Sequence, residues 1–414
     1  MNILRKILLP ILNRKNFSKK IKYYKYLKEN QWNSLDENSK IQKKLLYNNV
    51  LYSINNIPYY KNLGLNESDF SEENIFKNIK KFPFLTKDEL KREYDNLHIN
   101  YNNVRKIYEN TSGGSTGEPV KFMQDSHYHD WGRAIAILHD EWAGRKMGES
   151  KIKLWGSERD ILAQKKKLKH ILANWARNLK ILNSFKMSND DMLEYIKEIN
   201  NFQPNLILTY VQSIHELAKF IKQNNLEVYS PNSIMTSAGV LYPKYRELIT
   251  DVFDCPVFNR YGSREVGDMA CDCERHEGLH LSIFNHYIEI IDEDGERCEP
   301  GEMGQIVVTT LRNKTMPLVR YKIGDMGIMS DKKCSCGRGM PMLEKVVGRT
   351  VDVFKNKDGE LIDGEYFTHL FYFKDYINKF QVIQRETDYI EIKLVLNKDS
   401  NENIKSDFNL IKEK

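Results

Sequence analysis

The segment TSGGSTG, residues 111–117, consists only of Gly, Ser and Thr and lies between two β-prone runs. Glycines let a backbone approach an anion closely, and amides and hydroxyls donate hydrogen bonds to its oxygens. In an α/β domain such a loop is typical of phosphate binding. It is not a Walker motif, because Glu118 and Pro119 follow Gly117 where Gly-Lys-Ser/Thr is required. A flexible linker has a similar composition, so the assignment depends on further residues of the same site.

Three later segments carry side chains suited to a nucleotide site. NRYGSREVGD (259–268) places an aromatic residue, a glycine and a carboxylate at a strand end. LVRYKIGDMG (318–327) places Asp325 in a turn between β segments. EKVVGRTVDVF (344–354) places Arg349 at a change in composition. Together with the Gly/Ser/Thr loop, these segments predict one site rather than four unrelated features.

Cysteines and histidines form a possible metal-binding set. Four of the six cysteines lie in two short segments, as Cys271, Cys273, Cys334 and Cys336. Cys-x-x-His and Cys-x-Cys together supply the soft tetrahedral ligands that structural zinc takes. We predict that the zinc ligands are Cys273, His276, Cys334 and Cys336. Cys271 is the spare candidate, and His280 is expected to face the active cleft or the core. Buried thiols without a metal are the alternative. Disulfides are not expected, because the sequence shows no secretory signal.

Alternating strands and helices from residue 151 onward predict the body that positions these residues. The β-prone runs KIKLWG, NLILTY, SIMTSAG and PVFNRYG are separated by helical patterns such as SIHELAKFIKQNN and PKYRELITDVF. This alternation predicts a layered α/β domain with a largely parallel sheet. Helices are expected over residues 20–100, with Thr86 as an N-cap, and hairpins with Asp-Gly and Pro-Gly turns beyond residue 280.

Length and composition limit the class of protein. A chain of 414 residues predicts two or three domains, one of them large. Because no run of 18 apolar residues occurs, no membrane-spanning helix is expected. The net charge of +6 is small for this length, and the basic residues are spread along the sequence, so we expect no nucleic-acid partner. The basic N-terminus, MNILRKILLPILNRKNFSKK, predicts a helix packed on the body or a weak contact with an anionic membrane surface. We expect a cytoplasmic protein.

In this order the motifs resemble the adenylate-forming superfamily, and more narrowly its phenylacetate–CoA ligase-like branch. That branch includes adenylating proteins encoded with capsule-polysaccharide genes. IPYYKNLG, FPFLTKDEL, HDEWAGRKMGE and SAGVLYP extend the resemblance to roughly residues 30–396. It implies a large multi-layer α/β adenylating body, residues 1–347, with a zinc lobe near 271–336, and a small α+β C-terminal lid, residues 348–414. It also implies AMP-forming activation of a carboxylic acid by ATP, followed by acyl transfer to coenzyme A.

The resemblance gives each motif residue a role. The Gly/Ser/Thr loop would hold the β- and γ-phosphates, and Tyr261 would lie against adenine. Glu265 would help to hold Mg²⁺, Asp325 would accept hydrogen bonds from the ribose, and Arg349 would contact the nucleotide at the domain junction. The implied catalytic residues are Glu265, Thr116 and Arg349. The implied cofactor-binding residues are Thr111, Ser112, Gly113, Gly114, Ser115, Thr116, Gly117, Ser237, Ala238, Gly239, Tyr261, Gly262, Asp325 and Arg349. Taken singly, Tyr261 has a plain explanation as core, Glu265 as surface charge and Asp325 as a turn former.

The sequence departs from the branch at three places. Glu118 stands where many relatives carry lysine, and Val351 stands where an acidic residue is common at the hinge. The sequence also ends without the lysine-bearing loop of relatives, which predicts an incomplete lid and weak adenylation. Candidate acid-pocket residues are Trp131, Tyr210, Ser237, Ala238, Gly239 and Tyr242. Their aromatic and small side chains fit an aryl or modest acyl group, and no cation is evident for a second carboxylate.

Two other functions stay open. One is acyl or aminoacyl transfer to a sugar during surface-polysaccharide assembly. The other, of a different class, is a degenerate nucleotide-binding scaffold that no longer completes catalysis. The partners expected are therefore a small carboxylic acid, ATP with Mg²⁺, and coenzyme A or a sugar or amine acceptor. A homodimer is the oligomeric state considered.

Overall fold

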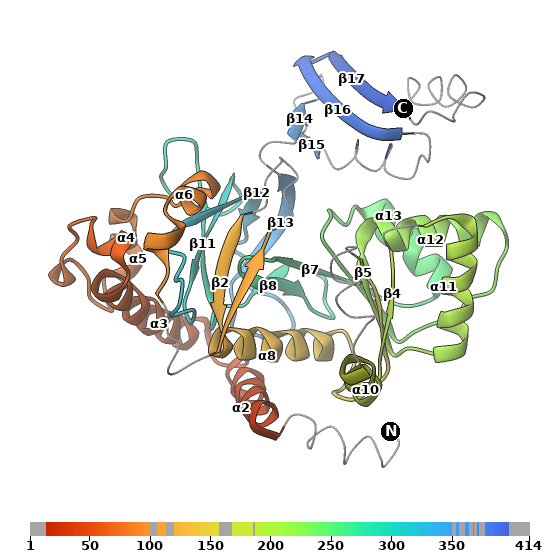
Figure 1. Cartoon of the computed structure of the whole chain (residues 1–414), viewed down its shortest axis with the longest axis horizontal. Helices are drawn as coiled ribbons and strands as arrows, with labels where there is room; N and C mark the ends of the chain where they lie inside the picture. The colour runs from red at the N-terminus through yellow and green to blue at the C-terminus, as the bar shows by residue number, and fades with distance from the viewer. Residues whose placement is uncertain are drawn as a thin grey trace.

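A mixed sheet of 11 strands forms the centre of the protein (Figure 1). The computed structural model describes residues 14–99, 106–112, 120–156, 168–184, 187–349, 353–355, 361–363, 367, 371 and 377–396. One half of the sheet contains β3 (Lys151–Leu154), β4 (Leu179–Leu182), β5 (Leu206–Tyr210), β6 (Ser233–Ser237) and β7 (Val257–Ser263). The other half contains β8 (Gly267–Asp272), β9 (Leu279–Leu281), β10 (His286–Ile291), β11 (Met303–Thr310), β12 (Tyr321–Met329) and β13 (Met342–Arg349).

The two halves differ in strand direction. The strand order is β10-β11-β12-β13-β9-β8-β7-β6-β5-β3-β4. All pairs from β7 to β4 are parallel, whereas all pairs from β10 to β7 are antiparallel. Strand β7 therefore joins a parallel half to an antiparallel half. The predicted α/β class is confirmed, and the predicted strands at KIKLWG, NLILTY, SIMTSAG and PVFNRYG correspond to β3, β5, β6 and β7.

Helices cover the parallel half because its strands present apolar side chains to them. The helices of this half are α10 (Leu168–Ala176), α11 (Asn189–Phe202), α12 (Val211–Gln223) and α13 (Pro243–Phe253). Ile152, Ile207 and Ile234 point to one face and pack into a core shared with α11, α12 and α13. These three helices lie together beside the strands in Figure 1. Burial on both faces is the usual state of parallel strands.

The N-terminal part packs on the antiparallel half. Its helices are α2 (Arg14–Asn30), α3 (Leu35–Asn56), α4 (Pro58–Lys61), α5 (Ile75–Asn78), α6 (Lys87–Arg92) and α7 (Tyr94–Leu97), with short 3₁₀ turns at Glu67–Asp69 and Ile79–Lys81. Thr86 caps α6 through a reciprocal pair of hydrogen bonds with Glu89, as the sequence predicted. Ser34 and Glu37 form the same capping box at α3. The caps fix where these helices begin.

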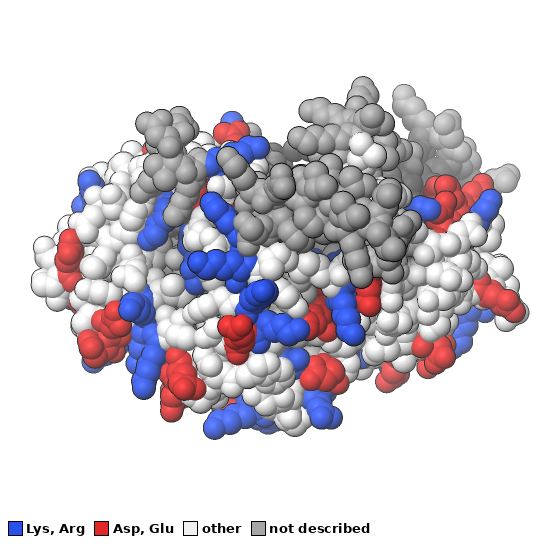
Figure 2. All heavy atoms as spheres, turned by 90° about the horizontal axis from the view of Figure 1, so that it is seen from below, with Lys and Arg blue, Asp and Glu red and all other residues white. Residues whose placement is uncertain are grey.

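The Gly/Ser/Thr loop emerges from a hairpin of β1 (Ile107–Thr111) and β2 (Lys121–Asp125). Asp125 then caps the long helix α8 (Ser126–Trp142) by accepting a hydrogen bond from the Tyr128 amide at 2.9 Å. On the face seen from below, Lys and Arg side chains are interspersed with Asp and Glu (Figure 2). No described helix is both long and apolar enough to cross a bilayer.

Beyond the large sheet the chain forms two small antiparallel pairs. They are β14 (Val353–Lys355) with β15 (Leu361–Asp363), and β16 (Ile377–Glu386) with β17 (Tyr389–Leu396). Neither pair joins the 11-stranded sheet. Val351 of the predicted hinge and residues 397–414 lie outside the described residues.

Candidate active site

A cavity of about 520 Å³ opens at the carboxyl ends of β5, β6 and β7. These ends meet at one edge of the sheet, beside the strand β7 at which the pairing changes from parallel to antiparallel. Such an edge is where open α/β sheets bind ligands, because the connections leave a crevice there. The lining residues are Lys87, Ser112, Trp155, Tyr210, Ser237, Ala238, Gly239, Val240, Asn259, Arg260, Tyr261, Gly262, Ser263, Arg264, Glu265, Asp268, Leu279, Asp325, Val346 and Gly348.

The cavity brings together predicted residues that are far apart in the sequence. The predicted cofactor-binding residues in its wall are Ser112, Ser237, Ala238, Gly239, Tyr261, Gly262 and Asp325. Glu265, predicted as a catalytic and magnesium-binding residue, also lies in the wall. Thr111 ends β1 and is not among the lining residues. Residues 113–118, which include Thr116, lie outside the described residues. Their roles, like the others, stay predictions.

Two hydrogen bonds close the base of the Gly/Ser/Thr loop. The Ser112 amide donates to the Val120 carbonyl at 2.9 Å, and the Val120 amide donates to Ser112 Oγ at 3.1 Å. Ser112 is buried at the cavity wall. The loop therefore leaves and re-enters the body at a fixed point beside the cavity.

Tyr261 of β7 and Asp325 of β12 form a hydrogen-bonded pair. The Tyr261 hydroxyl donates to Asp325 Oδ2 at 2.7 Å, and Asp325 is only 9% exposed. The prediction that Asp325 lies in a turn is wrong, because β12 continues through it. Gly324 adopts a φ of +87°, which bends the strand without ending it. The register of β12 and β13 places Arg349 directly opposite Asp325.

Two backbone features shape the cavity wall. Ala238, directly after β6, has a φ of +54°, which an alanine rarely adopts and which turns the chain sharply at the strand end. Gly262 lies so close to β8 that a Cβ there would be 2.6 Å from the Gly267 carbonyl oxygen. Only glycine fits at this crossing. Glu265 follows in the connection to β8 and is 6% exposed.

The structure brings part of the predicted acid pocket to the cavity. Tyr210 and Ser237 to Gly239 line the cavity, whereas Trp131 and Tyr242 do not. Trp131 stacks on Tyr23 with ring centroids 4.5 Å apart, so it holds α8 against α2. Tyr242 precedes α13 and its ring contacts Tyr245.

Charged wall residues escaped the sequence analysis. The expectation that no cation faces the pocket is wrong, because Lys87, Arg260 and Arg264 line the cavity. The Arg260 guanidinium pairs with Asp268 at 3.1 Å. Arg260 directly precedes Tyr261 in the NRYG segment, but its partner could be identified only once β7 and β8 were known to pair.

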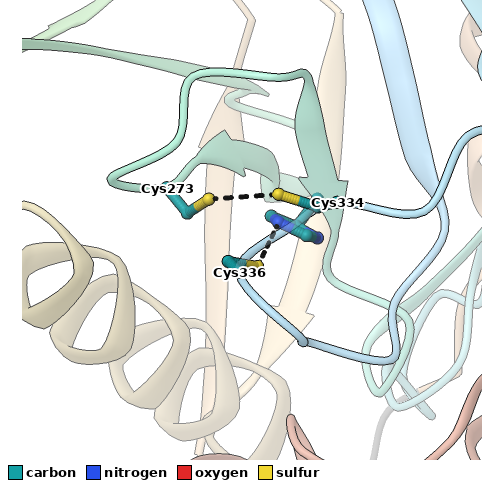
Figure 3. Close-up of side chains that lie close together, drawn as sticks. Cys273, Cys334 and Cys336 are labelled. Atoms are coloured by element: carbon teal, nitrogen blue, oxygen red, sulfur yellow. Dashed lines mark hydrogen bonds between the residues drawn. The ribbon is translucent and has the colours of Figure 1, made fainter.

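A second cluster lies on the antiparallel half. Cys273, His280, Cys334 and Cys336 place their ligand atoms within 4.8 Å of one another. The Sγ atoms of Cys273 and Cys334 are 3.6 Å apart, and Cys336 Sγ lies 3.4 Å from His280 Nε2. Figure 3 shows the three labelled cysteines pointing toward one another. Ligands at about 2.3 Å from a tetrahedral zinc lie about 3.8 Å apart, so these residues fit the ion.

His280, not His276, joins the three cysteines. His276 lies in the turn after β8, where its φ is +54° and its amide donates to the Cys273 carbonyl. That turn directs its Nδ1 to Asp272, 2.9 Å away, and to Arg246, 3.0 Å away. His280 instead lies in β9, opposite Met342 of β13, beside the segment that carries Cys334 and Cys336. The spare candidate Cys271 is fully buried in β8 outside the cluster.

The surroundings of the cluster favour the thiolate at Cys336, whereas burial raises the pKa of the Cys273 and Cys334 thiols. Backbone amides of Arg275 and Arg338 donate to the sulfurs of Cys273 and Cys336 at 3.5 and 3.4 Å. Burial raises the pKa of the Cys336 thiol, but hydrogen bonds from Arg338 outweigh this and hold the pKa below its ordinary value. Burial lowers the pKa of His280 to about 4, so the ring is neutral and able to act as a ligand.

Comparisons with known proteins agree with this fold. No protein-family model matches the sequence. The chain is 26% identical over 390 residues to Protein CapK of Staphylococcus aureus, which covers 92% of this chain and 83% of CapK. It is 22% identical over 336 residues to the phenylacetate-coenzyme A ligase of Pseudomonas putida, which covers 77% and 72%.

A solved structure matches the fold. The crystal structure of 2-hydroxyisobutyryl-CoA ligase in the postadenylation state has a TM-score of 0.65 at 16% identity, covering 89% of this chain and 80% of that one. These comparisons confirm the predicted resemblance: the chain is related in sequence to CapK and the phenylacetate–CoA ligases, and it has the fold of the adenylate-forming acyl-CoA ligases.

Proposed function

We propose that the protein is an AMP-forming ligase, which activates a carboxylic acid with ATP to an acyl-adenylate and then transfers the acyl group to coenzyme A. One observation carries the proposal: the cavity at the strand ends gathers Ser112, Tyr261, Glu265 and Asp325 from four separate segments. The similarity to phenylacetate-coenzyme A ligases over 77% of the chain supports the same reaction class.

The nucleotide would lie between the strand ends and β12. The bond from Tyr261 fixes the Asp325 carboxylate in the wall, where it can accept hydrogen bonds from the ribose hydroxyls. The Tyr261 ring beside it offers a flat surface for adenine. The Gly/Ser/Thr loop and Thr116 would hold the β- and γ-phosphates, and Arg349 would approach the nucleotide from the register position opposite Asp325.

Magnesium would be held by Glu265 together with the phosphates. Mg²⁺ binds through one or two carboxylates and substrate phosphates, and Glu265 supplies a buried carboxylate in the cavity wall. When bound, the ion neutralises charge on the phosphates as pyrophosphate leaves. The contribution of the protein is then to align the acid with the α-phosphate.

We also propose that Cys273, His280, Cys334 and Cys336 hold one structural zinc ion. All four ligand positions come from side chains, which leaves no open position for a reacting group. The ion would tie β8 and β9 to the Cys334–Cys336 segment. We retain the division into a body, residues 1–347, and a lid, residues 348–414, because the pairs after β13 do not join the large sheet.

A second acceptor deserves a direct comparison with coenzyme A. The similarity to CapK extends over 92% of this chain, whereas the similarity to the phenylacetate–CoA ligase of P. putida extends over 77%. Adenylating proteins encoded with capsule-polysaccharide genes also resemble the chain. This favours a sugar or sugar amine as the alternative acceptor of the acyl group, with the first half-reaction unchanged.

Pyrophosphate exchange tests the first half-reaction independently of the acceptor. Labelled pyrophosphate is supplied with Mg²⁺, ATP and each member of a panel of carboxylic acids, and formation of labelled ATP is measured. Asp325→Ala should lower the exchange rate by about 10- to 100-fold, because hydrogen bonds to a charged group are lost. Asp294→Ala, in the exposed turn after β10, is the matched control and should leave exchange unchanged.

The outcome separates the two classes of function. Exchange with at least one acid supports a ligase, and thioester formation on adding coenzyme A then distinguishes the acceptors. If no acid supports exchange but a non-hydrolysable ATP analogue still binds, the chain is a nucleotide-binding scaffold and the proposed activity is wrong.

A further inference from the structure

Strand β3 carries a lysine beside the candidate active site. Along β3, Ile152 and Leu154 face the core shared with α11 to α13. Because successive side chains of a strand point to opposite faces, Lys151, Lys153 and Trp155 face the other side. Trp155 lines the cavity, and Lys153 Nζ lies 4.5 Å from the centroid of its ring. Lys153 is therefore placed directly beside the cavity wall.

The charges around Lys153 do not balance. Lys151 pairs with Asp140 of α8 at 2.6 Å, and Arg260 pairs with Asp268 at 3.1 Å. Among the described residues, the carboxylate whose charge reaches Lys153 is Asp268, which is already paired with Arg260. Burial, followed by the positive charges of Arg260 and Lys151, lowers the pKa of Lys153 to about 7. Lys153 is half-buried, and a partly desolvated cation is stabilised when a ligand supplies the opposite charge.

Arg260 completes this wall. Its guanidinium lies 5.9 Å from the Trp155 ring centroid, so the ring is flanked by two cations. Arg260 itself lines the cavity. Its Nε is buried and has no hydrogen-bond acceptor in the part of the chain that the structure describes. The Arg260–Asp268 pair is neutral as a unit, so Lys153, when protonated, adds a positive charge to this side of the cavity.

A wholly apolar acid would leave that positive charge uncompensated. The nucleotide residues Tyr261 and Asp325 lie on β7 and β12, whereas Trp155 and Tyr210 follow or end the parallel strands β3 and β5. The Trp155 and Tyr210 rings pack together with centroids 4.1 Å apart. This aromatic corner, with Arg260 beside it, accommodates a short carbon chain that ends in an anionic group.

We propose that the acid substrate carries a second anionic group, a carboxylate or a phosphate, which binds Arg260 within the field of Lys153. The inference rests on the proposed adenylating function, because it concerns the end of the acid that is remote from the activated carboxylate. Arg260 would donate hydrogen bonds to the anion. Lys153 would act through its charge as a specificity-determining residue.

Matched acids and a charge-removing variant test the proposal. Glutarate and 3-phosphonopropanoate carry a second anion, whereas glutaramate and pentanoate do not. Pyrophosphate exchange gives kcat/KM for each acid, and calorimetry gives Kd on protein saturated with Mg²⁺ and a non-hydrolysable ATP analogue. The variants are Lys153→Met, Lys153→Arg as the charge-retaining form, and Lys180→Met on β4, a partly exposed lysine of the same sheet, as the control.

We expect the wild-type protein to prefer one of the dianionic acids over glutaramate. Lys153→Met should reduce that preference about 10- to 100-fold, the range of a charged interaction near a protein surface. Lys153→Arg should restore it, and Lys180→Met should not change it. The ratio between two acids is insensitive to a general loss of folding.

The two arms keep this inference separate from the proposed function. If no acid supports exchange, the adenylating function is wrong, and the calorimetric preference still decides the inference. Equal affinity of the wild-type protein for charged and uncharged acids would overturn it. A preference that survives in Lys153→Met would also overturn it, because Lys153 would then not set the charge of the pocket.

Discussion

The histidine at the start of β10 should make the stability of the protein sensitive to acid. His286 is 1% exposed, and its Nε2 lies 2.9 Å from the Tyr128 hydroxyl and 2.6 Å from the Val266 carbonyl oxygen. Burial lowers the pKa of His286 to about 4, although the Val266 carbonyl opposes this shift. The imidazole is therefore neutral in the folded protein near neutral pH.

The size of the effect follows from proton linkage. A histidine in the unfolded chain has a pKa of about 6.5, so below that pH the unfolded state binds a proton that the folded state does not. The stability contributed by the neutral ring is present above about pH 6.5 and is lost as the pH falls toward the folded value. Between pH 7.5 and pH 5 the loss is about 2 kcal/mol, and it reaches about 3 kcal/mol at pH 4.

Urea unfolding of His286→Gln at pH 7.5 and pH 5 measures this term. Glutamine keeps polar atoms near Tyr128 and Val266 but does not titrate. The cost of the substitution in unfolding free energy should therefore be about 2 kcal/mol smaller at pH 5 than at pH 7.5. Gln305→Ala on the neighbouring strand β11 is the control: it replaces a side chain that does not titrate, so its cost should be the same at both pH values. Equal costs for His286→Gln at both pH values would refute the neutral buried ring.

Three further predictions concern the two sites. Protein purified without added metal should contain about one zinc per chain by elemental analysis. His280→Ala should lower both the zinc content and the melting temperature. His276→Ala should leave the zinc content unchanged. Gly262→Ala should lower the unfolding free energy by about 1–3 kcal/mol in urea, because its Cβ would be 2.6 Å from a backbone oxygen of β8. Tyr261→Phe removes the bond to Asp325 and should weaken binding of an ATP analogue by about tenfold in calorimetry; an unchanged Kd would contradict the assigned geometry.

Sequence reasoning located the elements that have a strong local pattern. The strand β5 is a mostly apolar run, β6 has an apolar centre flanked by Ser and Thr, and α12 has an amphipathic period, so each could be predicted alone. Strand β4, Leu179–Leu182, has only four residues, and β9, Leu279–Leu281, has only three. Segments this short are strands because their neighbours pair with them. Asp325 was misplaced for the same reason: Gly-Asp is typical of a turn, but Asp325 pairs with Arg349 of β13, and Lys322 and Met326 on either side of it pair with β11.

The site was predictable where residue types form a contiguous motif, and less so where strand pairing assembles it. The spacing Cys-x-x-His pointed to His276, yet the path of the chain after the turn brings His280 to the sulfurs instead. Lys153 has no local signal, because one lysine in an apolar strand is ordinary on a solvent-facing edge. Only the fold brings Lys153 and Arg260 to the same Trp155 ring.

The cysteine cluster and the cavity share the same two strands, so removing a metal should affect ligand binding. Asp268, at the start of β8, holds Arg260 in the cavity wall, and the same strand ends next to Cys273. In β9, Leu279 lines the cavity while its neighbour His280 belongs to the cluster. Adjacent side chains of a strand face opposite sides, so one short strand supports both sites.

Loss of the metal should therefore loosen β9 before it unfolds the protein. We expect a chelator to weaken binding of the ATP analogue at temperatures where circular dichroism still shows a folded protein, and added zinc to restore it. The parallel half has its own packed core and should be less affected, whereas the N-terminal helices share a core with β8 and β9. If chelation removes the zinc and leaves the affinity for the analogue unchanged, β9 does not transmit order from the cluster to the cavity, and the ion stabilises only its own lobe.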